Sequence, residues 1–424
     1  MEKLTTHKER LSALKARLSG SASFRAPTKR SDRSRPPPNP MFLAVLHAAA
    51  RYAAGLDLSP IEQGFILMLK IYSTDKEIAQ YGKMYTEMRS QPQFLANSKG
   101  TCLQMDEKTP YTEADMITDA QANLQEILAR PENKILDISS LEGDGIDDAE
   151  YAKALAKAGS GITVITGPEP DPDGSDTPIT NMGSDHQEPV HPVDPGPLYF
   201  LKVDRFMCHR KQNDSIFGPR NEVYWSFAAG ADGGAQKSFK TGEYGEVESG
   251  DVRQMNIDFF EGVVHGHLGG HIECWEADDS DSEFYNKMVE TLRSIGEYLM
   301  DAAVDATQES AGSNWGGSTG KPGKGEAILA LVAICTVLVA ELVAFFRNDD
   351  DLVYRREIAF TTSGLDAWAE RPNHELSFMF DGGSNGKHEL WLTCEQGSIP
   401  GDTTIPGDTT IPVSKNMNTV NTRV

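Results

Sequence analysis

A change of hydrophobic period near residue 198 most constrains what this chain can fold into. Before it, runs such as MFLAVLHAAARYAAGL (41–56) and TEADMITDAQANLQEILAR (112–130) repeat apolar residues every three or four positions, as α-helices do. After it, short segments rich in aromatic and β-branched residues are bounded by Gly, Asn and Asp, as strands are. The sequence therefore predicts an α+β protein: a helical N-terminal domain followed by an antiparallel β-sandwich.

Local signals place several helix ends before residue 160. Ser59 is followed by Pro60 and Glu62, which predicts an N-cap and a first helical turn. Thr112 predicts a second N-cap, and Gly159 predicts the end of a short helix over DDAEYAKALAKA. The apolar stripes of these helices are expected to form a core.

Composition divides the chain of 424 residues into parts. A chain of this length exceeds what one hydrophobic core usually serves, so more than one domain is expected. We predict a basic disordered arm (1–40), a helical domain (41–166), an acidic proline-rich linker (167–197), the sandwich (198–396) and a disordered tail (397–424).

Seven segments carry the strand pattern. They are LYFLKVDRFMCH, EVYWSFAAG, DVRQMNIDFFEGVV, GHIECWEA, LVYRREIAF, HELSFMFDGG and KHELWLTCE. Two helical runs interrupt them and predict a helical hairpin inserted at 282–346. Its second run, AILALVAICTVLVAELVAFF, has about the length that crosses a bilayer core. Two alternatives stay open for it: a helix buried under an amphipathic partner, or a helix that inserts into a membrane.

Charge narrows the class of partner. Residues 1–40 carry a net charge of +7 and the rest of the chain −30, within −23 for the whole. An acidic body of this size repels nucleic acid and favours cations. Five scattered cysteines without a CxxC pair argue against a disulfide framework, and the polar N-terminus shows no secretory signal. We expect a cytoplasmic protein, with membrane association as an open possibility.

Two acidic clusters flank the insertion. The first follows the strand that ends in Cys274 and Trp275, and the second follows the hydrophobic helix and runs into the next strand. Alternation along a strand puts Glu276 and Asp278 on one side, and a hairpin insertion would bring both clusters together. Several carboxylates at one edge suit Ca²⁺, which takes six to eight oxygen ligands. The carboxylates expected to meet are Glu276, Asp278, Asp349, Asp350 and Asp351.

Residues 198–396 resemble C2 domains. CWEAD followed by RNDDDLVY is similar to the third calcium loop of that family, and QNDSIFGPRNEVYWSF is similar to the first. The resemblance implies an eight-stranded sandwich that binds calcium at one end and docks on lipid headgroups, and it adds Asp214 and Glu222 as ligands. The chain departs from the family where Glu276 replaces an Asp and where the long insertion separates the clusters.

Other chemistry competes with calcium. Asp278 and its neighbours could cap the following helix, although Asp349–Asp351 follow a helix C-terminus, where the dipole disfavours acids. In HGHLGGH, two histidines would share a strand face and Gly269–Gly270 would turn the third back to them, which suits Zn²⁺ or Cu²⁺. The candidate ligands there are His265, His267 and His271, with Glu261 or Glu273.

Enzymatic signatures are few. The chain has no GxSxG, Walker or Rossmann motif. The leading hypothesis is a calcium-responsive binding module that docks on anionic lipid or on a protein partner. The alternatives are an enzyme that uses the histidine region, as a metal site, or the cleft between hairpin and sandwich, and a toxin-like protein that inserts its hydrophobic hairpin into membranes.

Overall fold

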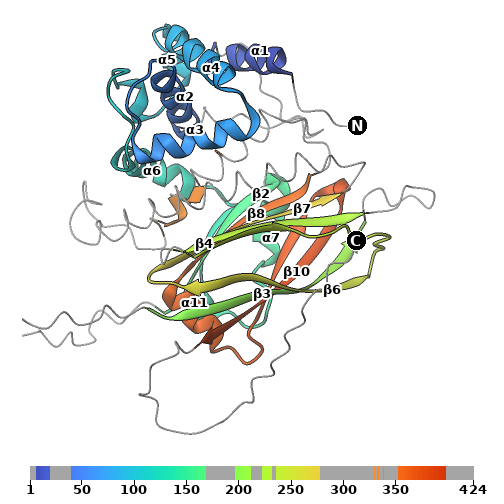
Figure 1. Cartoon of the computed structure of the whole chain (residues 1–424). Helices are drawn as coiled ribbons and strands as arrows, with labels where there is room; N and C mark the ends of the chain where they lie inside the picture. The colour runs from blue at the N-terminus through green and yellow to red at the C-terminus, as the bar shows by residue number, and fades with distance from the viewer. Residues whose placement is uncertain are drawn as a thin grey trace, which may run out of the picture.

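The computed structural model describes most of the predicted helices and strands. The described residues are 6–19, 40–168, 196–211, 222–231, 235–276 and 352–397, with seven positions between 326 and 338. Two β-sheets lie face to face, and a layer of helices covers the larger sheet (Figure 1). The predicted α+β class is confirmed.

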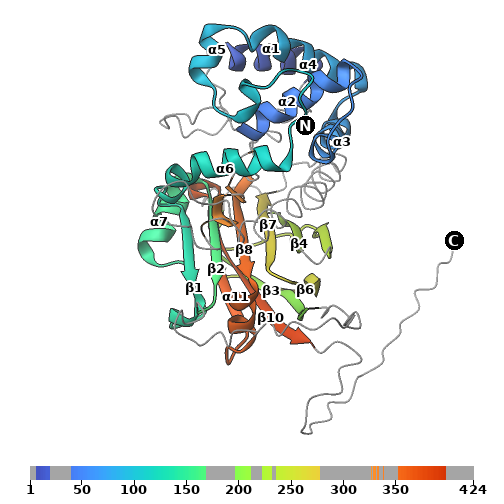
Figure 2. The same cartoon turned by 90° about the vertical axis from the view of Figure 1, so that its left-hand side faces the viewer.

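The helical layer contains six helices in the described chain. They are α1 (His7–Leu18), α2 (Pro40–Ala53), α3 (Pro60–Tyr72), α4 (Asp75–Met88), α5 (Pro92–Asn97) and α6 (Glu113–Leu128), with a 3₁₀ helix at Thr101–Leu103. The predicted caps are confirmed: the Glu62 amide donates to Ser59 Oγ at 3.3 Å, and the Thr112 amide donates to Asp115 Oδ2 at 2.8 Å. Figure 2 shows α6 between the other helices and the sheet.

Part of the predicted disordered arm is a helix. Leu14 and Leu18 of α1 are buried in the same core as α2 and α4. Arg10 donates from Nη2 to Glu77 of α4 at 3.1 Å and from Nε to the Tyr81 hydroxyl at 3.0 Å. The basic composition suggested disorder, but leucines at helical spacing and one basic residue find partners on α4.

The larger sheet has six strands and the smaller sheet has four. In spatial order the larger contains β1 (Asn133–Asp137), β2 (Ser160–Thr166), β8 (Leu352–Thr361), β7 (His267–Glu276), β4 (Val223–Ala231) and β5 (Gln236–Lys240). The smaller contains β6 (Val252–Val263), β3 (Leu198–Arg210), β10 (Lys387–Gly397) and β9 (Glu375–Asp381). The connections described include α7 (Ala149–Ala158), α11 (Thr362–Ala369), and 3₁₀ helices at Ile138–Ser140 and Gly383–Asn385.

The sequence predicted a helical domain before residue 167, but this part of the chain also contains two strands. β1 and β2 pair in parallel with each other, and β2 pairs in parallel with β8, so the larger sheet is mixed. The chain from residue 198 onward contributes four strands to each sheet, and these strands pair antiparallel with one another. α7 ends at Gly159, whose φ of 77° confirms the predicted stop and turns the chain directly into β2. The proline-rich segment 169–195 and the tail 398–424 lie outside the described residues.

Alternating side chains divide the core into two layers. Along β7, Leu268, Ile272 and Cys274 point between the sheets, whereas Trp275 points toward the helices. The helical layer packs on that outer face through residues such as Ile162, Tyr224 and Trp275.

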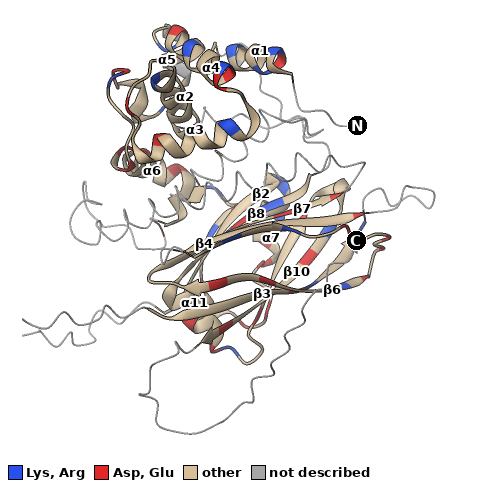
Figure 3. Cartoon of the chain, in the orientation of Figure 1, with Lys and Arg blue, Asp and Glu red and all other residues tan. Residues whose placement is uncertain are grey.

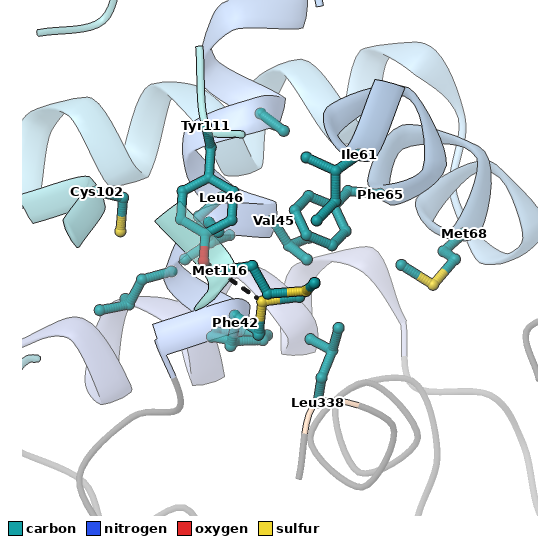
Figure 4. Packing of buried hydrophobic residues seen from close by; sticks show 14 of the residues in the cluster. Phe42, Val45, Leu46, Ile61, Phe65, Met68, Cys102, Tyr111, Met116 and Leu338 are labelled. Carbon is teal, nitrogen blue, oxygen red and sulfur yellow. Dashed lines mark hydrogen bonds between the residues drawn. The ribbon is translucent and has the colours of Figure 1, made fainter. Parts of the chain in front are cut away.

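The predicted hydrophobic helix is described only in part. Its described positions are helical, and the apolar ones are buried, with Leu338 fully covered. Figure 4 shows Leu338 beside Met68, Met116 and Phe42 of the helical layer. The first helix of the predicted hairpin lies outside the described residues. Within the described chain, no helix is both long and apolar enough to cross a membrane.

Candidate functional site

Three strand ends meet at one end of the larger sheet. Val223, the first residue of β4, pairs with Glu276, the last residue of β7. Trp275 pairs with Leu352, the first residue of β8. The smaller sheet reaches the same end, because Gly382, after β9, packs so closely on β8 that a Cβ there would lie 2.4 Å from the Val353 carbonyl oxygen. We call this the acidic end, defined by Glu222, Glu276 and the chain that enters β8 at Leu352.

Two of the predicted calcium ligands are described. Glu222 is half-buried just before β4, and Glu276 is only 6% exposed. Alternation along β7 puts Glu276 on the side of Ile272 and Cys274, toward the sandwich interior. The other predicted ligands lie outside the described residues: Asp214, Asp278, Asp349, Asp350 and Asp351.

The predicted histidine turn does not form. Gly269 and Gly270 are both inside β7 and pair with Ala359 and Ile358 of β8, so they extend the strand. His267 and His271 share the helix-facing side of β7, whereas His265 precedes the strand. The His265 ring lies over Gly196, where a Cβ would approach Nδ1 at 2.8 Å. In the described chain no three His, Cys, Asp or Glu side chains are grouped as metal ligands.

His271 instead belongs to a buried network of four ionisable side chains, which we call the charged layer: His271 and Glu273 of β7, and Arg355 and Glu357 of β8. His271 Nδ1 contacts Glu357 Oε1, and Nε2 lies 3.1 Å from Glu273 Oε1 without the angle of a hydrogen bond. Arg355 Nε donates to Glu273 Oε1 at 3.0 Å. All four side chains are at least 90% buried. They lie on the helix-facing side of the sheet, and the residues between them along each strand face the interior of the sandwich.

Charge balance explains how this layer tolerates burial. Burial alone would lower the pKa of His271, but the carboxylates of Glu357 and Glu273 raise that pKa to about 9. Burial alone would raise the pKa of Glu273, but Arg355 and His271 lower it to about 2. His271 and Arg355 therefore lie against the carboxyl groups of Glu357 and Glu273. Figure 3 shows both signs of charge on the strands of the larger sheet.

Aromatic contacts connect the charged layer to the acidic end. Trp275 Nε1 donates to Glu273 Oε2 at 3.1 Å. The Trp275 ring stacks on Tyr224 of β4, with 6.2 Å between centroids and 5° between planes. The Lys240 ammonium of β5 lies 5.9 Å from the centroid of the Tyr224 ring. Tyr224 and Trp275, the neighbours of Val223 and Glu276, are thus part of a chain of contacts that runs from Lys240 on β5 to Arg355 on β8.

A second buried network lies on the opposite face of β8. Arg356 donates from Nη1 and Nη2 to the two carboxylate oxygens of Asp147, at 2.6 and 2.7 Å, and from Nη2 to Thr163 of β2 at 2.8 Å. Asp147 Oδ2 also accepts from the Met379 amide of β9 at 2.8 Å. Arg356 therefore joins the parallel edge of the larger sheet to the smaller sheet.

Sequence reasoning missed the two arginines and Glu357. The signal was present in RREIAF, where three charges sit in an otherwise apolar strand, and in HIECWE, where charges alternate with apolar residues. Charges rarely enter a buried strand unless they are paired. A search for paired charges on two strands would have found the layer.

The described contacts of the charged layer include His271 with Glu357, Arg355 with Glu273 and Trp275 with Glu273, and all four of its side chains are buried. Such an arrangement favours a positioning role over catalysis, and the acidic end stays the candidate binding site. Comparison with protein-family models and with curated protein sequences finds no match to this chain.

Proposed function

We propose that this chain is a calcium-responsive binding protein whose acidic end docks on anionic lipid headgroups. The observation that carries the proposal is the register of three described strands. Because Val223 pairs with Glu276 and Trp275 pairs with Leu352, the chain leaves β7 and enters β8 at neighbouring points beside the start of β4. Asp351 precedes Leu352 directly, and Asp278 follows Glu276 by two positions.

Electrostatics would make lipid docking at such a site depend on calcium. Uncompensated carboxylates repel the phosphate groups of anionic lipid, and a bound divalent cation offsets that repulsion. Hard oxygen ligands of flexible geometry match Ca²⁺ better than Mg²⁺, which requires a stricter octahedron. The resemblance to C2 domains points the same way and remains a proposal about this chain.

Calorimetry of EDTA-stripped protein with CaCl₂ tests calcium binding, and flotation with phosphatidylserine vesicles tests docking. We expect calcium heat that disappears when Asp349, Asp350 and Asp351 are all changed to Asn. The matched control changes Asp171, Asp173 and Asp176 to Asn, which alters net charge equally in the proline-rich segment and should retain the heat. No calcium heat in the unmodified protein would end the calcium proposal.

Flotation separates the two partner classes. We expect calcium-dependent flotation with phosphatidylserine vesicles and little with neutral phosphatidylcholine vesicles. Calcium binding without flotation would replace the lipid by a protein partner.

A further inference from the structure

We propose that His271, Glu273, Arg355 and Glu357 are positioning residues that fix the register of β8 against β7. This register also puts the end of β7 beside the start of β8 at Leu352, and its value for binding calcium rests on the proposed function. The register itself is a property of described strands and stands independently of calcium.

The connection between these strands cannot fix their register. A tight hairpin sets register through its turn, but the chain from 277 to 351 is far too long to do so. Long loops also add little entropic preference between neighbouring registers. Side chains that face each other across β7 and β8 are in a position to carry that information.

The native register pairs opposite charges twice. His271 lies directly opposite Glu357, and Glu273 lies directly opposite Arg355. Both pairs are on the helix-facing side, under cover. A direct cross-strand pair is the closest side-chain contact that a sheet offers, so its sign matters most there.

A shift of β8 by two residues, in either direction, keeps every side chain on its side of the sheet. Both of these registers place side chains of like charge opposite each other. A shift of two residues in one direction puts Glu273 opposite Glu357. The same shift in the other direction puts His271 opposite Arg355 and leaves Glu273 opposite Val353. A shift of β8 by one residue instead turns Arg355 and Glu357 into the apolar core between the sheets and leaves His271 and Glu273 without their partners. Each alternative therefore buries a repulsive or unpaired charge, which is more costly than the loss of one contact.

Hydrophobic residues alone would not discriminate in this way. The inward side of β8 carries Ile358 and Phe360 beside Arg356, whose hydrogen-bond partners among the described side chains are Asp147 and Thr163 and not residues of β7. That of β7 carries Leu268 and Ile272. A shift of two residues exchanges apolar partners for other apolar partners there. The charged layer supplies a distinction between registers that the apolar pairs of β7 and β8 lack, at the cost of burying four ionisable side chains.

Paired cysteines report the register directly. Gly269 is opposite Ala359 in the native register, so Gly269→Cys with Ala359→Cys should cross-link on mild oxidation with copper–phenanthroline. Gly269→Cys with Thr361→Cys reports a shift of two residues. Peptide mass spectrometry gives the yield of each cross-link. In otherwise unmodified protein we expect the first cross-link and little of the second.

Charge variants then test the layer. Arg355→Glu should lower the native cross-link by roughly tenfold or more, and Glu273→Arg with Arg355→Glu should restore it. Asp147→Asn is the control, because it removes a buried ion pair of β8 outside the layer. It should lower stability and leave the cross-link pattern unchanged. Native cross-link yields that are equal in Arg355→Glu and in the restored pair would overturn the proposal.

A second variant, in which the charged layer is made neutral, keeps the proposal testable if Arg355→Glu does not fold. We combine His271→Gln, Glu273→Gln, Arg355→Met and Glu357→Gln, which keep volume and remove charge. Register fixing predicts both cross-links in this variant, whereas a purely stabilising role predicts the native one alone. Calcium calorimetry on the same proteins separates the two proposals: absent heat in unmodified protein removes calcium only, and a single register in the neutral variant removes the register proposal only.

Discussion

At the scale of single residues, neighbours decide what burial does to a histidine. His271 and His388 are both almost completely covered. His271 faces two carboxylates and has a raised pKa. His388 is surrounded by Phe206 and Trp225, with ring centroids 5.9 and 6.2 Å away, and its Nδ1 has no hydrogen-bond partner in the described chain. Burial, with smaller contributions from His209 and Arg210, lowers the pKa of His388 to about 4.

His388 should therefore make the protein sensitive to acid. Its unfolded pKa is near 6.5, so the unfolded chain takes up the proton first as pH falls. The stability that the neutral ring contributes is complete above 6.5 and is lost as pH falls toward 4, by on the order of 3 kcal/mol. Urea unfolding across this range should show a smaller loss for His388→Phe. His186→Phe, in the proline-rich segment, should follow the unmodified protein, and identical pH profiles for all three would contradict the assignment.

At the scale of elements, the segment around Leu338 carries the open question of membrane insertion. Its described apolar residues lie in the core of the helical layer, as expected if the helix is buried in the folded protein. If the helix instead inserts into membranes, replacing one of its apolar side chains by a charged one should hardly change the stability of the protein in solution.

Leu338→Asp should therefore destabilise the protein by several kcal/mol, because it buries an unpaired charge. Leu67→Asp is the matched control, since Leu67 of α3 is 46% exposed, and its effect should stay within about 0.5 kcal/mol. Circular dichroism melts measure both. A Leu338→Asp protein that melts like the control and fails to float with vesicles would favour the membrane alternative.

At the scale of the whole molecule, the two sheets and the helices are tied together from distant parts of the chain. β2 pairs with β8 over six positions, from Ser160 with Arg355 to Ile165 with Phe360. Arg356 bonds Asp147 and Thr163 across the same boundary. The Tyr151 hydroxyl, on α7, also contacts Thr163 Oγ1 at 2.9 Å. The proline-rich segment therefore connects two parts of one sheet and does not separate two independent domains.

Cleavage in that segment should leave the two pieces associated. A protease site inserted between residues 175 and 185 would cut the chain without touching a described strand. We expect the pieces to co-elute in gel filtration in native buffer and to separate only in denaturant, because parting them would expose the edge of β8 and leave Arg356 unpaired in the core. Pieces that elute apart in native buffer would show that the contact with β2 is weak.

The sequence by itself determined what depends on near neighbours. Local patterns predicted helices between residues 41 and 160 and seven of the strands, and missed α1 and α11. The caps at Ser59 and Thr112 and the stop at Gly159 follow from bonds within a few residues. Nearby residues favoured the wrong structure at Gly269–Gly270, because two glycines usually signal a turn. In the folded sheet they have strand partners on both sides, in β4 and β8.

Only the tertiary structure decided which strands meet and which charges are buried. β1 and β2 are short and lie among helices, so nothing local to them identifies β8 as a partner. The four residues of the charged layer come from segments separated by the long insertion. The sequence marks them as charges within apolar strands, and only the pairing of the strands shows which charge meets which. The acidic end depends on the same pairing, because the proximity of β7's end to β8's start is set by hydrogen bonds and side chains across the sheet. Contacts between distant segments carry that information, and a local pattern cannot.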